Sequence, residues 1–452
     1  MTTRKAHATP TKDFFVRMIT KDIALEDCIL DLIDNCIDGA RKVQNAAHAS
    51  VAVDDYKGFY ANVAFDGGNF AIDDNCGGIK IAEAIDYAFH FGRRSDAPAE
   101  GDYSIGLYGI GMKRAIFKMG NAIEIYSSTA EEAFRATIDV AAWLTKKRTL
   151  VADEAPIDDW DFEIDDADVD AATGTRIRII QLHAAIAAQY ANPEFANGLA
   201  RIVGRDYAQF IAKGFAISIN GRKIAGFPFT VGESAEFKPV RVEYTDDSGV
   251  EVAIIAGMAG PPPDDLQPTE RRSETDNFGW FVLCNDRVVV AADKTDQTVW
   301  GDEDFPSWHY QYNGFIGVVA FHAKDPNLLP WRTTKRDVDG SNPTYRRAIE
   351  KMKDATRPWI KYTHDRKADI PAAKEREAMT MARSLFDIAV NPTFQVPKVS
   401  ATSARIATSS IQYTKPTTEI AKVKKLLGNA RMPNYQVGSE TFDYFLKNEA
   451  EE

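Results

Sequence analysis

Residues 21–43 constrain the fold most, because their apolar side chains recur at the spacing of one face of an α-helix. Thr20 is expected to cap the N-terminus of this helix. At 3.6 residues per turn, Asn35 lies about 40° from Asp31 and Asp38 about −20° from it, so the three share a face. An amide and a carboxylate one turn apart can hold a phosphate-bound Mg²⁺ and a water molecule. A solvated helix face is the simpler alternative. The apolar residues of 21–43 that recur at helical spacing are Leu25, Cys28, Ile29, Leu32, Ile33, Cys36, Ile37 and Ala40.

The composition is that of a soluble protein with a buried core. The chain has 452 residues, of which 44% are hydrophobic. At roughly 100–200 residues per domain, this length indicates two or three domains. The apolar run 314–321 is too short for a bilayer span of about 20 residues, so no membrane partner is expected. Four cysteines without a CxxC pair favour a reducing, cytoplasmic location.

The charge is unevenly distributed. The formal charge is −12, which argues against coating nucleic acid by bulk attraction. Ten acidic residues and no basic one lie in 153–170, a segment expected to be a solvated connection with Trp160 and Phe162 held against the body. In 391–431, seven Lys and Arg residues accompany only Glu419. This basic segment could contact phosphates, or it could be a solvated linker that tethers a partner-binding helix.

Strands and helices are expected to alternate along the chain. Strand-like alternation covers 60–72, and further strands are predicted at 122–127, 133–139, 175–180 and 216–219. Helices are predicted at 79–91, 109–119 and 197–213. Towards the C-terminus, 371–390 is predicted to be one amphipathic helix, 391–418 a Ser/Thr/Pro-rich linker, and 420–427 a short amphipathic segment.

Three further motifs carry possible chemistry. Asp74 is predicted to end a strand, shortly before Gly77 and Gly78. A carboxylate at this position can accept a hydrogen bond from an exocyclic amine of a bound base. The alternative interpretation of this motif is an ordinary turn. Glycines at 106, 109 and 111 precede a predicted helix, whose free backbone N–H groups can bind phosphate. The pair Gly174-Thr175 opens a strand, and alone it is also typical of a turn.

The order and spacing of these four motifs resemble the GHKL ATPases, which include MutL, the gyrase B subunit, the ninety-kilodalton heat-shock chaperone and the MORC proteins. The matching segments are 31–40, 74–78, 106–111 and 174–175. The resemblance implies an α/β fold, a two-layer sandwich of the Bergerat type, with ATP between the helices and the sheet. It also implies a flexible lid, at 92–105.

The same resemblance assigns roles to individual residues. Asp31 would be the catalytic carboxylate, Asn35 the Mg²⁺ ligand, and Asp74 the carboxylate that reads adenine, supported by the Thr175 hydroxyl or a water. The remaining ATP-binding positions would be Asp38, Gly78, Gly106, Gly109, Gly111 and Lys113, although Lys113 could equally be an exposed helix lysine. Two positions depart from the family: Asp31 stands where Glu is usual, and Cys76 where Gly is usual.

A second domain resembles the transducer of MORC-type proteins, an α+β domain of ribosomal-protein-like type. The resemblance rests on the segments 279–290, 314–319 and 329–337, with Trp300 between them. In such a domain a lysine of the final loop reaches the γ-phosphate, and Lys335 is the matching residue. The expected domains are therefore 1–235 for ATP binding, 236–365 for the transducer, and 366–452 for a helix, a linker and a tail.

The leading hypothesis is a MORC-like Mg·ATP-dependent ATPase that acts as an ATP-gated dimeric clamp, probably on DNA in genome maintenance or defence. ATP would order the lid and an N-terminal strap that includes Phe14 and Phe15, and the tail could bind a protein partner. Two alternatives remain: a chaperone-like clamp on protein clients, and a nucleotide-binding scaffold with little hydrolysis. A histidine kinase is disfavoured, because no phospho-acceptor helix is recognisable.

Overall fold

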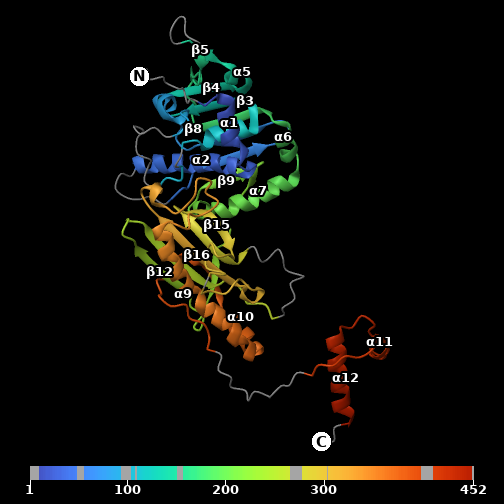
Figure 1. Ribbon diagram of the computed structural model, residues 1–452. Coiled ribbons are helices and arrows are strands. Elements are labelled where there is room, and N and C mark those ends of the chain that lie inside the picture. The colour runs from blue at the N-terminus through green and yellow to red at the C-terminus, as the bar shows by residue number, and fades with distance from the viewer. Residues whose placement is uncertain are drawn as a thin grey trace, which may run out of the picture. The chain divides into compact units, whose positions relative to one another are not determined.

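The computed structural model describes residues 10–47, 55–92, 103–106, 109–149, 156–264, 277–302, 304–398 and 411–449. These residues divide into two compact units, with the division after Val399. The described part of the first unit contains two large sheets, of eight and five strands, with their helices, and two smaller two-stranded sheets (Figure 1). The predicted mixed α/β class is confirmed by these elements.

The first sheet has eight strands in the order β10-β9-β1-β2-β8-β3-β4-β7. Its strands pair antiparallel except for the parallel pair β1–β9. Their bounds are β1 Tyr60–Phe65, β2 Phe70–Asp74, β3 Gly120–Ser128, β4 Ala133–Asp139, β7 Asp165–Ala167, β8 Gly174–Leu182, β9 Ala216–Ile219 and β10 Arg222–Lys223. The helices associated with this sheet are α1 Lys12–Lys21, α2 Leu25–Ala47, α3 Ile81–Glu83, α4 Gly111–Met119, α5 Val140–Thr145, α6 Ala184–Tyr190, α7 Pro193–Asp206 and α8 Ala208–Ala212.

Helix α2 buries the apolar stripe that its sequence predicts. All eight predicted side chains are at most 4% exposed, and α2 packs against α4 and β1. The expected cap at Thr20 is wrong, because Thr20 lies inside α1 and its hydroxyl donates to the carbonyl of Val16. The chain turns between the two helices, so α2 begins four residues later than its periodicity suggested.

Three predicted elements are subdivided in the structure. The alternating run 60–72 is a hairpin, because the Asp66 carboxylate accepts from the backbone N–H groups of Gly68 and Asn69 and turns the chain. The helix expected at 79–91 is α3 followed by a π-helical turn, Ala84–Ala88. The helix expected at 197–213 begins earlier, at Pro193, and is interrupted at Tyr207 between α7 and α8.

The acidic segment contributes two short strands: Ile157–Asp158 (β6) pairs with Lys147–Arg148 (β5), and β7 pairs with β4 at the edge of the first sheet. Residues 150–155 lie outside the described residues. As predicted, the two aromatic side chains of this segment contact the body: Trp160 and Phe162 pack on Phe91 and Trp143. Aromatic packing therefore holds this acidic connection to the domain.

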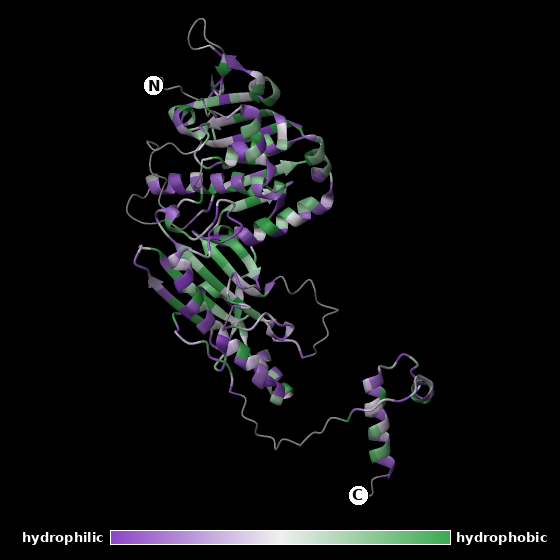
Figure 2. Cartoon of the chain, in the orientation of Figure 1, coloured by the Kyte–Doolittle hydropathy of each residue, from purple (hydrophilic) through white to green (hydrophobic). Residues whose placement is uncertain are grey.

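The second sheet has five strands in the order β12-β13-β16-β14-β15, with β14 and β16 parallel. Their bounds are β12 Val240–Thr245, β13 Glu251–Met258, β14 Gly279–Cys284, β15 Arg287–Asp293 and β16 Phe315–His322. Helix α9, Pro343–Asp365, packs along β13 and β16 (Figure 1). The central strands are strongly hydrophobic (Figure 2), as expected for strands buried on both faces. Short 3₁₀ turns occupy Tyr310–Tyr312, Pro326–Leu328, Arg366–Ala368 and Leu385–Asp387.

The single helix predicted at 371–390 is wrong. The structure has α10, Ile370–Ala378, and then β17, Met381–Ser384, which pairs with β11, Thr230–Glu233. The apolar residues expected on one face do not share an environment, since Met379 is 71% exposed and Leu385 is fully buried. Backbone pairing with β11 therefore outweighs the local helical pattern.

The predicted linker also begins later than expected. Asn391 and Gln395 exchange backbone hydrogen bonds with Arg241 and Lys238, and Phe394 is buried against Trp359. Residues 391–398 thus belong to the first compact unit, which includes much of the region expected to be tail. Residues 399–410 lie outside the described residues.

The second compact unit contains two helices, α11 Thr417–Leu426 and α12 Asn434–Glu449. The amphipathic segment predicted at 420–427 lies in α11 up to Leu426, where that helix ends. Many apolar side chains of this unit are exposed, among them Leu426, Tyr435, Phe442, Tyr444 and Phe445. Among all described residues, no helix is both long enough and apolar enough to cross a membrane.

Candidate functional site

A cavity of about 910 Å³ opens in the first unit between α2, the end of β2, the first turn of α4 and a loop of the second domain. Every residue that the sequence proposed for ATP binding or catalysis lines this cavity. These residues are Asp31, Asn35, Asp38, Asp74, Gly78, Gly106, Gly109, Gly111, Lys113, Thr175 and Lys335. Folding thus brings together motifs that lie up to three hundred residues apart in the chain.

At one end of the cavity, backbone N–H groups surround Asp74. Its Oδ1 accepts from the backbone N–H of Cys76 at 2.8 Å and of Thr175 at 3.3 Å, while the Cys36 thiol donates to Oδ2 at 3.4 Å. Burial raises the pKa of Asp74, and these hydrogen bonds offset part of that rise. Gly78 has φ +70°, and a Cβ there would overlap the carbonyl of Ser128, so the close approach requires glycine.

Thr175 supports Asp74 differently from the expectation. Its backbone N–H contacts the carboxylate, whereas its hydroxyl pairs with Ser127 Oγ at 2.9 Å. Ser127 also accepts from the backbone N–H of Ile79. No sequence pattern singled out Ser127, which joins β3, β8 and the turn after β2 at this end of the site.

On α2, Asn35 and Asp38 have different surroundings. Asn35 is exposed and faces the cavity, where an amide oxygen could ligate a metal ion. Asp38 is already engaged, because it accepts from the Ser104 hydroxyl at 2.9 Å and from the backbone N–H groups of Ile105 and Gly106 at 2.8 and 2.6 Å. Burial raises the pKa of Asp38. Asp38 therefore holds the start of the glycine motif, and its part in binding ATP stays a prediction.

The first turn of α4 also lines the cavity. Its N-cap residue, Ile110, provides no side-chain cap, so the first amides of the helix keep donor capacity for an anion. Lys113 follows in this turn, but it is buried and donates to the carbonyl of Ala88 at 2.8 Å. Burial lowers the pKa of Lys113 to about 7. The alternative of an exposed lysine is thus wrong, while a phosphate contact stays a prediction.

Asp31 is paired with an arginine that the sequence analysis did not consider. Arg114 places Nε at 2.7 Å and Nη2 at 2.6 Å from Asp31 Oδ2. The other oxygen, Oδ1, lies 3.9 Å from Lys335 Nζ. Burial raises the pKa of Asp31, against the opposing effects of Lys335 and Arg114.

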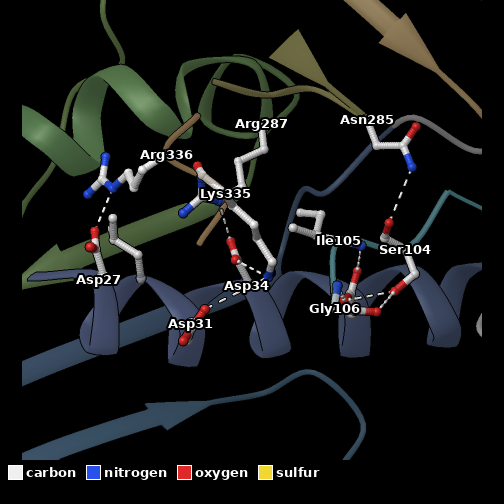
Figure 3. Close-up of polar contacts among 12 residues, drawn as sticks. Asp27, Asp31, Asp34, Ser104, Ile105, Gly106, Asn285, Arg287, Lys335 and Arg336 are labelled. Carbon is white, nitrogen blue, oxygen red and sulfur yellow. Dashed lines mark hydrogen bonds and ion pairs between the residues drawn. The ribbon is translucent and has the colours of Figure 1, made fainter. Parts of the chain in front are cut away.

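Lys335 enters the cavity from the second domain (Figure 3). Its Nζ lies 2.7 Å from Asp34 Oδ2, and its backbone is left-handed, with φ +53°. Arg287 binds both partners, with Nε at 2.8 Å from Asp34 Oδ1 and Nη1 at 3.0 Å from the Lys335 carbonyl. Tyr207 also donates to Asp34, at 2.7 Å. Burial opposes ionisation of Asp34, yet Arg287 and Lys335 hold its pKa below the usual value.

Two more contacts join the second domain to the part of the unit that contains the eight-stranded sheet (Figure 3). Arg336 forms ion pairs of 2.5 Å with Asp27 of α2 and with Asp206 of α7. Asn285, in the turn between β14 and β15, donates to the Ser104 carbonyl at 3.2 Å. The second domain thus contacts both α2 and the segment that Asp38 holds.

The residues present fit ATP with Mg²⁺. The cavity offers an acceptor at Asp74, uncapped amides and a lysine at α4, and an exposed amide at Asn35. These groups match, respectively, an aminopurine, a phosphate chain and a divalent cation.

Comparison with known families supports this arrangement. Residues 23–171 match the family model described as histidine kinase-, DNA gyrase B- and HSP90-like ATPase. The match covers the motifs at 31–40, 74–78 and 106–111, and it ends before Thr175 and the second domain. A search of curated proteins found no match. Residues 23–171 are therefore similar to a GHKL-type ATPase domain, which suggests ATP binding.

Proposed function

We propose that the protein is an Mg·ATP-dependent ATPase of MORC-like architecture, which acts as an ATP-gated dimeric clamp on DNA. The observation that carries the proposal is the position of Lys335. A lysine from a second domain lies in the cavity that the GHKL motifs line, 3.9 Å from the candidate catalytic carboxylate. A cation delivered from another domain couples the chemistry at the cavity to domain position.

In this proposal, each end of the cavity has a separate task. Asp74 accepts a hydrogen bond from the adenine amino group, while the amides of α4 and Lys113 bind the phosphates. Asn35 holds Mg²⁺, which neutralises phosphate charge when bound. Asp31 accepts a proton from the attacking water, and Lys335 stabilises charge on the γ-phosphate. The second domain acts as the transducer.

Surface features support the proposed dimerisation and the proposed clients. Phe14 and Met18 are both 58% exposed and lie one turn apart on α1, which suits a helix that packs on a second copy when ATP is bound. The basic segment 391–431 supports DNA as the client. The exposed aromatic side chains of α12 support a protein partner at the tail.

The central experiment is hydrolysis by Asp31→Asn. We expect this variant to bind ATP with wild-type affinity and to lose at least about a hundredfold in turnover, because an amide cannot accept the proton from water. Phosphate release and calorimetry measure the two properties. Wild-type turnover in Asp31→Asn would exclude Asp31 as the base. Wild-type protein that binds ATP without hydrolysing it would favour the scaffold alternative.

A second experiment distinguishes a DNA clamp from a chaperone-like clamp. Truncation after Val399 removes the second compact unit and leaves 391–398 in place against β12. We expect DNA binding that weakens steeply with salt, and a smaller salt dependence after truncation, because fewer counterions are released. An unchanged salt dependence would move the DNA contact to the first unit, and absence of DNA binding would favour protein clients.

A further inference from the structure

We propose that Arg114 is a positioning residue for ATP hydrolysis: it occupies one carboxylate oxygen of Asp31 and so leaves the other oxygen as the acceptor for water. This inference rests on the proposed ATPase function and extends it to a residue outside the motifs that define the site.

The contact geometry is one-sided. Both nitrogens of Arg114 that contact Asp31 lie at 2.6–2.7 Å from Oδ2. Oδ1 has no partner within 3.5 Å among the described residues, and its nearest cation is Lys335 Nζ at 3.9 Å. The two side chains are 11% and 6% exposed, so water does not compete freely for the pair. A charge-assisted contact to one oxygen determines the orientation of the whole carboxylate.

The pair also links the carboxylate to the phosphate-binding helix. Arg114 lies three residues after Gly111 in the first turn of α4, whose amides face the cavity. Asp31 packs directly on that turn, because a Cβ at Gly111 would lie 3.3 Å from both Cβ and Cγ of Asp31. The helix that binds the phosphates therefore carries the side chain that orients the base.

Orientation matters more than basicity for this carboxylate. An arginine that contacts Oδ2 reduces the proton affinity of Asp31 and so makes it a weaker base. The pairing can therefore favour hydrolysis only by improving the position of Oδ1 relative to the attacking water. An error of about 1 Å in placing a catalytic group can cost a hundredfold in rate. Aspartate has a short side chain, and the Arg114 contact limits the positions that Oδ1 can occupy.

The proposed step is hydrolysis of the bond between the β,γ-bridging oxygen and the γ-phosphorus of ATP. Oδ1 of Asp31 accepts a proton from water, and the water oxygen forms a new bond to the γ-phosphorus. The bond between that phosphorus and the β,γ-bridging oxygen breaks, and its electron pair leaves with ADP. The proton then passes from Asp31 to solvent, and the products are ADP and inorganic phosphate.

The test compares Arg114→Met, Arg114→Lys and a control, Arg178→Met, in the full chain. Arg178 lies on β8 beside Glu124 at 3.6 Å and is half exposed, so its loss removes an arginine–carboxylate pair far from the chemistry. Calorimetry with a non-hydrolysable ATP analogue gives Kd, single-turnover hydrolysis gives the rate, and thermal unfolding confirms that each variant is folded.

We expect Arg114→Met to keep Kd within about threefold and to hydrolyse ATP some 10- to 100-fold more slowly. Arg114→Lys should recover part of the rate, because an ammonium group can bind one oxygen. Combined with Asp31→Asn, Arg114→Met should slow the reaction no further, since it acts through that carboxylate.

Three results would overturn the proposal. Faster hydrolysis in Arg114→Met would mean that the arginine restrains Asp31, and an unchanged rate would mean that it does not orient the base. A loss of affinity that matches the loss of rate would place Arg114 in nucleotide binding instead. Failure of the proposed ATPase function would be seen in the wild-type protein, which would then bind no ATP or would bind it without hydrolysis. Either result would also exclude a role of Arg114 in hydrolysis.

Discussion

Asp74→Asn is expected to abolish measurable ATP binding, with a loss of at least about a hundredfold in affinity. The reason lies in how the carboxylate is held. Its Oδ1 accepts two backbone N–H groups, from Cys76 and Thr175, so the oxygen of an asparagine would remain at that position. The new NH₂ group would replace Oδ2, where the adenine amino group needs an acceptor. Two donors would then face each other in a buried site.

Calorimetric titration with ATP measures this effect, and Asp73→Asn provides the matched control. Asp73 is the adjacent carboxylate on β2, but it accepts from Asn62 at 3.2 Å and does not line the cavity. We expect Asp73→Asn to bind ATP normally. If Asp74→Asn retained wild-type affinity, adenine would have to be recognised elsewhere in the cavity.

Asp34→Ala should have the largest effect on folding, a loss of about 3–5 kcal/mol in the free energy of unfolding. Asp34 is 0% exposed, and it neutralises Arg287 and Lys335, which are 2% and 6% exposed. Its removal would leave two buried cations, and Lys335 would keep its 3.9 Å contact with Asp31. Removing one member of a buried ion pair is much more destabilising than replacing the whole pair.

Urea unfolding without nucleotide tests this expectation. Asp13→Ala is the control, because Asp13 and Arg17 form an exposed pair on α1 and its loss should hardly shift the midpoint. A double variant, Asp34→Leu with Arg287→Met, should recover part of the loss, since it removes the uncompensated charge of Arg287. Equal midpoints for Asp34→Ala and the wild type would show that this charge cluster does not stabilise the contact between the domains.

Local patterns in the sequence were sufficient for the elements that carry the site. The apolar periodicity of α2 predicted its buried side and hence the common face of Asp31, Asn35 and Asp38. The order of the four motifs predicted one shared cavity, which the structure contains. Predictions were wrong where hydrogen bonds to a distant strand determined the local conformation. An example is β17, whose partner β11 lies some 150 residues earlier in the chain.

The amino-acid sequence by itself determined the helix that carries the polar stripe, the glycine-containing turns and the family to which residues 23–171 are similar, because each depends on neighbours within a few turns of chain. Only the tertiary structure decided which charges meet. Arg114 is 83 residues from Asp31, and Arg287 and Lys335 are 253 and 301 residues from Asp34. No periodicity relates such positions, and their pairing follows from burial: a charge removed from water requires an opposite charge, whichever segment supplies it.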